Sequence, residues 1–120
     1  MEMESILTSI KKMLGITAAY DHFDADIIMH INDAFTVLNQ LGVGPANGFF
    51  IEDDSAVWSD FSEDTKTIHT VKTYIFRKVK VVFDPASLGS ATLAAYERQI
   101  QEQEWRLNVA AESEETTETN

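Results

Sequence analysis

The sequence has no cysteine among its 120 residues, no basic N-terminal segment followed by an apolar stretch, and no long apolar run. The absence of cysteine excludes disulfide bonds, thiolate metal sites and cysteine nucleophiles. The other two absences lead us to expect neither a signal peptide nor a membrane-spanning helix. We therefore expect a soluble protein that is not exported by an encoded signal.

Positive charge is scarce as well. Nine Lys and Arg residues stand against twenty Asp and Glu residues, which gives a formal net charge of −11. A free-standing nucleic-acid-binding protein needs a basic footprint, and this composition argues against one. Five of the nine basic residues lie between Lys66 and Lys80.

On a helix, three of those basic residues would share one face with a histidine and a threonine. The residues that share it are Lys66, His69, Thr73, Arg77 and Lys80. A basic face is most often simply solvated. In an acidic protein it is also a natural docking surface for acidic groups of a neighbour, and the acidic loop and tail described below are the candidates.

Reactive motifs are missing too. The chain has no P-loop, no G-x-S-x-G, no G-x-G-x-x-G and no H-E-x-x-H. His22, His30 and His69 lack the spacing that would turn two imidazoles toward one metal ion. Asp24 and Asp26 fit the first turn of a helix, where negative charge is stabilised, better than an acid–base pair. We expect no enzymatic activity, no metal site and no cofactor.

What the chain does have is apolar residues at helical spacing, in a sequence that is 44% hydrophobic and of single-domain size. Four segments, near residues 3–14, 24–41, 62–84 and 87–109, predict helices. Asp24 and Ser62 are expected to accept backbone N–H groups at the starts of the second and third. The predicted fold class is all-α, a small bundle of four helices. Its expected core stripes are Ile6, Leu7, Ile10, Met13 and Leu14; Ile27, Ile28, Ile31, Ala34, Phe35, Leu38 and Leu41; Ile68, Val71, Ile75, Val79 and Val82; and Leu93, Tyr96, Ile100 and Leu107.

Residues 45–60 interrupt this pattern between the second and third predicted helices. They show no helical period and carry the acidic run Glu52, Asp53, Asp54 among aromatic residues. We expect an irregular loop or a short β-hairpin here, with exposed aromatic anchors and no helix. The helical domain is expected to span residues 1–109, and the acidic residues 110–120 to form a disordered tail.

Trp105 lies off the apolar stripe of the fourth predicted helix. A tryptophan there either packs on the loop or serves as an interface anchor, because tryptophan and arginine are enriched in hot spots. With the aromatic loop, it favours an assembly component over a lone monomer. The residues expected to contact other subunits or neighbouring proteins are Phe49, Phe50, Trp58, Lys66, Arg77, Lys80, Trp105 and Arg106.

Five segments together resemble one protein family over roughly residues 5–110. They are FDADIIMHIN (residues 23–32), LGVGP (41–45), WSDF (58–61), VKTYIFRKVKVVFDP (71–85) and ERQIQEQEWRLN (97–108). The chain resembles the head–tail connector proteins (adaptors, sometimes labelled DNA-packaging proteins) of siphophages that infect low-GC Gram-positive bacteria. None of these segments is a catalytic motif, and the acidic tail lies outside the resemblance.

The resemblance implies a bundle that assembles into a homo-oligomeric ring under the phage portal protein. Such a ring extends the DNA channel, joins the head to the tail, and offers a surface to the next connector or tail-completion protein. DNA would pass through without sequence-specific binding, and an acidic wall would not hold it. The implied location is the head–tail junction of the virion, after synthesis in the bacterial host cytoplasm, with no enzymatic activity and no membrane partner.

Two other functions stay open at this point. An acidic regulatory or decoy protein that occupies a DNA-binding partner would suit the net charge, although the acids are scattered rather than laid along one face. A small hydrolase would need a concave pocket lined by converging polar groups.

Overall fold

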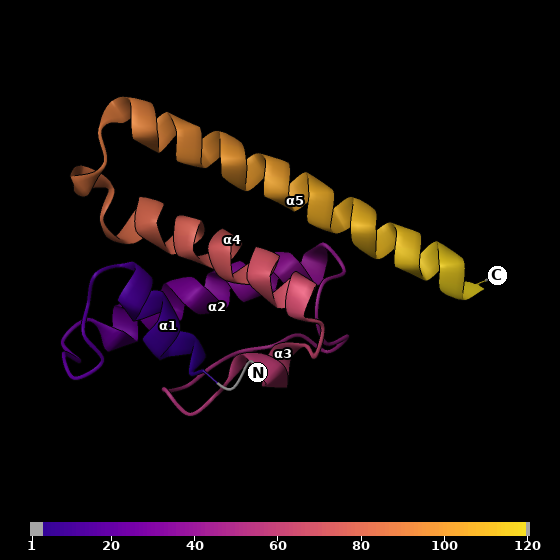
Figure 1. Cartoon of the computed structure of the whole chain (residues 1–120), viewed down its shortest axis with the longest axis horizontal. Coiled ribbons are helices and arrows are strands. Elements are labelled where there is room, and N and C mark those ends of the chain that lie inside the picture. The colour runs from indigo at the N-terminus through magenta and orange to yellow at the C-terminus, as the bar shows by residue number, and fades with distance from the viewer. Residues whose placement is uncertain (1–3, 120) are drawn as a thin grey trace.

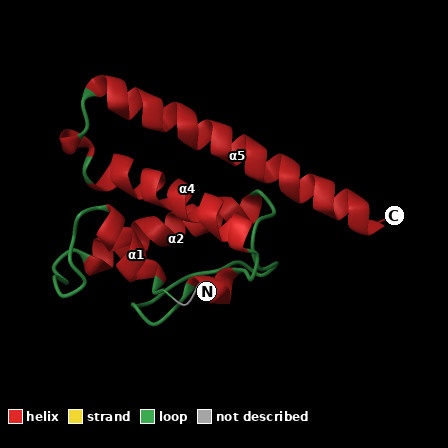
Figure 2. Cartoon of the chain, viewed as in Figure 1, coloured by secondary structure: helices red, strands yellow, loops and turns green. Residues whose placement is uncertain are grey.

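The computed structural model describes the backbone of residues 4–119 and the side chains of residues 4–113, and within these residues it contains helices and loops but no strand (Figures 1 and 2). The elements in chain order are α1 (Ile6–Met13), α2 (Asp24–Gln40), α3 (Trp58–Phe61), α4 (Thr65–Phe83), the 3₁₀ turn η1 (Pro85–Ser87) and α5 (Ser90–Thr119). The predicted all-α bundle is confirmed, with α1, α2, α4 and α5 as its four predicted helices.

The central element is α4, which packs against α1 and α2 on one side and runs antiparallel to α5 on another (Figure 1). Ile68, Ile75 and Val79 on its inner face are fully buried, as their helical spacing predicted. Val82 was predicted to continue this core stripe, and that prediction is wrong, since its side chain is 56% exposed. It lies in the last turn of α4, where the helix borders an open groove instead of the core.

The remaining core comes from α1, α2 and the segment around α3. The stripe of α2 is buried at Ile27, Ile31, Ala34, Phe35 and Leu38, while Ile28 and Leu41 pack at its edge. In α1, Ile6, Leu7 and Ile10 are buried, but Met13 is 38% exposed because it lies at the helix end. This single cluster holds the three N-terminal elements and α4 together.

The segment between α2 and α4 differs from the prediction in two ways. The described residues there form no β-hairpin, and the one antiparallel bridge joins Ser5 to Val57. The backbone of Ile51 is instead satisfied by a side chain, because Asn32 accepts its N–H at 2.8 Å and donates to its carbonyl at 2.9 Å. The side-chain amide of Asn32 thus makes the two backbone hydrogen bonds that a neighbouring strand would otherwise make with Ile51.

The second difference is the helical turn α3, where no helix was expected. Trp58 and Phe61, three residues apart, both point into the core, and Asp60 accepts the N–H of Val57 at 3.0 Å. Gly44 makes room for this turn: its φ is +91°, and a Cβ atom there would lie 2.5 Å from the Phe61 ring. Burial of two aromatic rings therefore decides the local conformation.

The expected helix starts are also corrected. Ser62 does not cap α4; Asp64 does, accepting from the backbone N–H of Lys66 at 3.2 Å and from the Thr67 hydroxyl at 2.7 Å. The Thr67 hydrogen bond holds the pKa of Asp64 below its ordinary value. Asp24 makes no cap either, because its carboxylate turns to another partner.

That partner is Lys11 of α1, whose ammonium lies 2.7 Å from Asp24 Oδ1 and is only 2% exposed. The same ammonium donates to the carbonyl of Ala18 at 3.1 Å, within the loop that joins α1 to α2. Among the described residues, Asp24 Oδ1 has no hydrogen-bond donor besides this cation. One buried charge thus ties α1, its following loop and the start of α2.

The helical backbone of α5 continues past the domain boundary expected at residue 109. Ala111 extends the packed stripe of this helix and lies beside Gly42. The side chains of residues 114–120 lie outside the described part of the chain. The expectation of a disordered tail over residues 110–120 therefore stays a prediction, although the backbone is helical as far as Thr119.

Replacing Asp24 with asparagine is expected to lower the free energy of unfolding by about 2 kcal/mol, because it leaves the buried Lys11 ammonium unpaired. Chemical denaturation followed by circular dichroism measures this. Adding Lys11→Met to Asp24→Asn should recover part of the loss, since no buried charge then remains. An Asp24→Asn protein as stable as the parent would show that the Lys11–Asp24 ion pair does not stabilise the fold.

Candidate assembly interface

The contact between α4 and α5 combines apolar packing, such as the edge contact of the Phe76 and Tyr96 rings, with several polar contacts. Gln103 accepts from Arg77 Nη1 at 2.9 Å and donates to the Thr73 hydroxyl at 3.0 Å. The Tyr74 hydroxyl donates to Glu104 at 2.8 Å, and Lys78 lies 3.8 Å from the same carboxylate. Burial, and then the Glu104 carboxylate, raise the pKa of Tyr74, so its hydroxyl stays protonated and remains a donor. We call this set of contacts the polar seam.

The polar seam uses part of the basic face that the sequence predicted as a docking surface. Arg77 is half-buried under α5 and bonded to Gln103. Lys80 is 15% exposed and lies 3.3 Å from Asp84 of its own chain. Both cations are engaged within the subunit, so their contact with a neighbour stays a prediction.

The other end of that basic face remains accessible. A groove of about 450 Å³ runs between the first half of α4 and the second half of α5. Lys66 and His69 of α4 and Arg106 of α5 are exposed along it. Within the described residues, the side chains of Lys66 and His69 make no hydrogen bond or ion pair. The residues that line this cationic groove are Lys66, Thr67, His69, Thr70, Thr73, Gln103, Arg106, Leu107 and Ala110.

Arg106 already has a partner in the cationic groove, the Glu102 carboxylate one turn earlier on α5. Both side chains are more than half exposed, and such surface pairs contribute little and exchange partners readily. Arg106 is therefore accessible to an incoming anion. The sequence flagged Lys66 and Arg106 separately, but their proximity depends on the register of α4 against α5.

The aromatic residues of the loop separate into buried and exposed members. The Trp58 side chain is fully buried and donates from its indole nitrogen to the Ser9 hydroxyl at 2.8 Å, so the expectation that it is exposed is wrong. Phe49 is half-buried, with its ring centroid 5.0 Å from that of Phe35 and 5.5 Å from that of Phe61. Phe50 alone of the three predicted aromatic anchors is exposed, at 63%.

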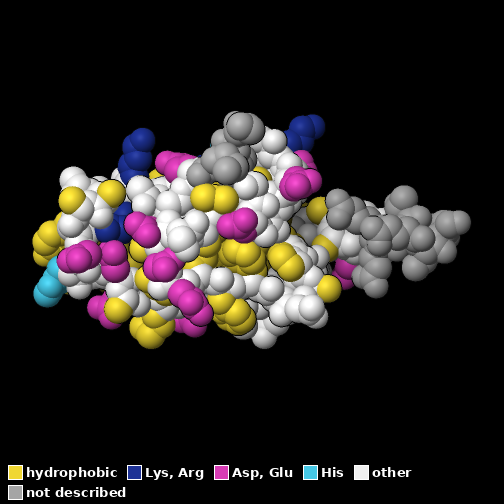
Figure 3. All heavy atoms as spheres, turned by 90° about the horizontal axis from the view of Figure 1, so that it is seen from below, with side chains coloured by type: hydrophobic (Ala, Val, Ile, Leu, Met, Phe, Trp, Pro, Cys, Tyr) yellow, Lys and Arg dark blue, Asp and Glu magenta, His cyan; other side chains and the backbone are white. Residues whose placement is uncertain are grey.

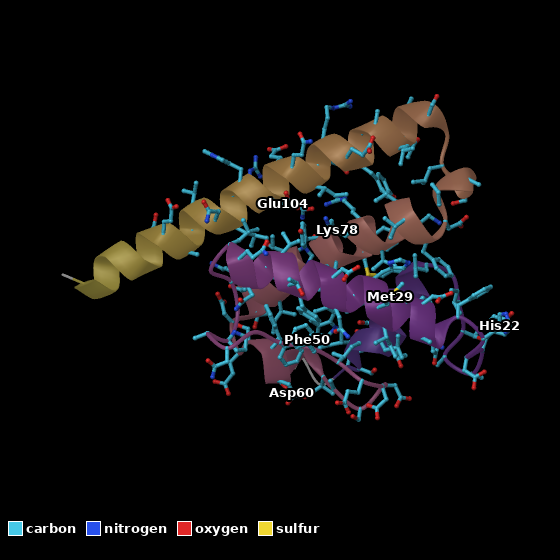
Figure 4. All side chains as sticks on the ribbon, turned by 180° about the vertical axis from the view of Figure 1, so that it is seen from behind. His22, Met29, Phe50, Asp60, Lys78 and Glu104 are labelled. Carbon is cyan, nitrogen blue, oxygen red and sulfur yellow. The ribbon has the colours of Figure 1, made fainter. Side chains whose placement is uncertain are left out.

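Beside Phe50, the acidic run Glu52, Asp53, Asp54 is exposed. The hydroxyl and backbone N–H of Ser55 both donate to Asp53, and these bonds hold the pKa of Asp53 below its ordinary value. The loop lies on the side of the bundle away from α5, and Figure 4 shows Phe50 below α2 on that side. We call residues 50–54 the acidic loop.

The outer face of α5 carries a second exposed aromatic residue. Trp105 is 67% exposed, and Val109, one turn further, is 39% exposed. Both lie opposite the buried Ile100 and Leu107 of the same helix. The α5 stripe therefore completes the bundle, and Trp105 remains free of it, as the sequence predicted. Its role as an interface anchor is a prediction.

An apolar patch that the sequence did not predict lies at the opposite end of α4. Phe23, Val82 and Phe83 line a groove of about 550 Å³ there, with Leu14, Ile16, Asp26, His30 and Asp84 around them. The Phe23 and Phe83 rings meet edge to face, with centroids 5.3 Å apart. Val82 fitted the core stripe by periodicity, so nothing local in the sequence marked it as exposed.

The described side chains form no group of three His, Asp or Glu residues that could hold a metal ion. The described helices include none with the length and apolar character needed to cross a bilayer. Figure 3 shows acidic side chains scattered among apolar ones on the face viewed from below. Taken together, the described residues define a small helical-bundle protein whose exposed cations and exposed aromatic side chains lie in open grooves and on outward faces.

The chain belongs to the phage connector protein family, whose model matches residues 6–114. No curated protein and no solved structure matches it. The resemblance found in the sequence is thereby confirmed. Since this family is structural, the chain is a connector component of a bacteriophage particle and associates with other head or tail proteins.

Replacing Gln103 with alanine is expected to lower the free energy of unfolding by about 1 to 2 kcal/mol, because half-buried Thr73 and Arg77 lose their partner. Gln101→Ala, two residues away on the exposed side of α5, is the matched control and should change it by less than about 0.5 kcal/mol. Thermal and urea denaturation measure both. Equal stabilities of the two variants would show that the polar seam contributes nothing.

Proposed function

We propose that the chain is the head–tail connector subunit that forms a homo-oligomeric ring below the portal, extends the DNA channel and joins the head to the tail. The observation that carries this is the outward face of α5 in a chain of the connector family. Trp105 is 67% exposed there, on a helix whose inner stripe is already satisfied. Tryptophan is enriched among the residues that contribute most to protein interfaces, so an exposed one supports a contact that forms on assembly.

The charge of the chain supports a channel role. With a net charge of −11, the subunit has little to hold the phosphate backbone, so DNA can slide past it. Most of its cations are also engaged with carboxylates of the same chain, as at Lys11, Lys78 and Lys80. A channel wall of this composition would let DNA pass without binding it.

The acidic decoy alternative gains no specific support. A protein that imitates DNA would lay its carboxylates in a row with phosphate-like spacing. On the face shown in Figure 3, acidic and apolar side chains alternate without such a row. The hydrolase alternative requires a nucleophile or an acid–base pair directed into a pocket. In the cationic groove, the hydroxyls of Thr67, Thr70 and Thr73 instead donate to Asp64 or to backbone carbonyls of α4, and no described hydrogen bond joins them to His69.

The proposed function is tested by incubating the purified chain with DNA-filled heads that contain portal and with shells that lack it. We expect co-sedimentation with the portal-containing heads alone, and tails should then attach to those heads. Binding to neither particle, together with tight binding to a DNA-binding protein, would favour the decoy alternative.

Trp105→Ala is expected to leave the stability of the chain within about 0.5 kcal/mol of the parent, because its side chain is largely exposed. The same variant should lose most of its binding to portal-containing heads. Ile100→Ala is the control on the inner stripe, and it should lose stability instead. If the Trp105→Ala protein binds heads normally, the outer face of α5 does not contact the portal-containing head.

A further inference from the structure

The subunit carries two exposed surfaces of opposite charge on opposite sides of the bundle. The cationic groove lies between α4 and α5, with Lys66, His69 and Arg106 along it. The acidic loop, with Glu52, Asp53 and Asp54, lies beyond α2 on the far side (Figures 1 and 4). The two surfaces cannot meet within one chain, because the helices of the bundle stand between them.

Their chemistry matches in more than charge. The apolar part of the groove comes from Leu107, Ala110 and the threonine methyl groups, and its cations lie on the two bordering helices. The acidic loop presents the same two components in one short stretch: an exposed phenyl ring at Phe50 and carboxylates two to four residues later. Both surfaces therefore combine apolar and charged groups within a short distance along the chain or across one groove.

The carboxylates beside the groove offset its charge only in part: the Asp64 carboxylate attracts Lys66 electrostatically but makes no described ion pair with it. Asp64 is held by the start of α4, where the Lys66 backbone N–H and the Thr67 hydroxyl occupy its oxygens. Glu102 pairs with Arg106 through side chains that are both more than half exposed, so a stronger ligand can displace it. Lys66 and His69 keep their charge or hydrogen-bonding capacity for a partner.

We propose that the acidic loop of one subunit docks, Phe50 first, into the cationic groove of the next copy of this chain. The proposal rests on the proposed function, since it specifies how subunits of the connector meet. A contact between two different surfaces of identical chains is head-to-tail, and repeating it closes a ring when the rotation per subunit permits. The charge complementarity sets the register and direction of this contact.

The chain has no cysteine, so a pair of introduced thiols reports on this contact alone. Phe50→Cys with Thr70→Cys places one thiol in the acidic loop and one on the groove. In oxidised particles of the phage that encodes the chain, we expect a ladder at multiples of its 13.5 kDa mass. Phe50→Cys with Met29→Cys, an exposed site on α2, is the control and should give no ladder.

Charge reversal provides the second measurement. Lys66→Glu with Arg106→Glu should weaken self-association of the purified chain at least about tenfold. Lys12→Glu with Arg98→Glu changes the net charge equally at exposed sites elsewhere and should not. Adding Glu52→Lys and Asp54→Lys to the groove variant should restore association. All substituted positions are exposed, and circular dichroism checks that each variant folds.

The outcomes separate this inference from the proposed function. If the chain is found in particles at the head–tail junction but the Phe50–Thr70 pair stays at monomer mass, the contact is wrong and the connector role stands. The contact is equally overturned if the groove and control reversals behave alike. If the chain is absent from purified particles, the proposed function fails, and the inference that rests on it fails as well.

Discussion

The structure depends on α4 packing against α1 and α2 on one side and against α5 on the other. Toward α1 and α2 it presents Ile68, Ile75 and Val79, whose burial is non-directional. Toward α5 it presents Phe76, which packs on Tyr96, together with hydrogen-bonding groups, and the hydrogen bonds do not tolerate sliding. If α5 moved by one residue, Gln103 would lose both its partners, and half-buried donors without partners are costly. The apolar layer therefore stabilises the bundle, and the polar seam fixes its register, which in turn brings Arg106 to Lys66 across the cationic groove.

Periodicity in the sequence was enough for the helices and most of the core. The stripe from Ile27 to Leu38 and the stripe from Ile68 to Val79 follow from 3.6-residue spacing alone, because each helix buries one continuous face. Periodicity could not predict contacts between segments that are distant in the sequence. Trp58 of the α3 turn is buried where its indole bonds to Ser9 of α1. Arg77 of α4 is partly covered where it bonds to Gln103 of α5. The ends of the stripes also failed, at Val82, because spacing does not show where the neighbouring helix stops.

Scarce positive charge is largely committed inside the chain. Lys11, Lys72, Lys78 and Lys80 each lie within 4 Å of a carboxylate, and Arg77 bonds to an amide. The candidate interface could be predicted from the sequence only in part for this reason: a cluster of cations marks the region, but the fold decides which of them face outward. Lys66 and His69 face outward because they lie in the first turns of α4, before the residues that form the polar seam. Two of the exposed cations, Lys66 and Arg106, thus border the cationic groove, while Lys12 and Arg98 are exposed elsewhere on the subunit.

The contacts of α1 also constrain the order in which the chain can fold. Ser5 pairs with Val57, and the Trp58 indole reaches the Ser9 hydroxyl across 49 residues of sequence. Helix α1, with eight residues, is too short to persist alone. It therefore depends on its contacts with α2 and with the distant region of α3. Closing the loop between Ser9 and Trp58 costs entropy before any contact compensates, so the Ser9–Trp58 hydrogen bond and the Ser5–Val57 bridge are expected to form late and together. The burial of α1 is thus coupled to the folding of a segment that follows it by more than forty residues.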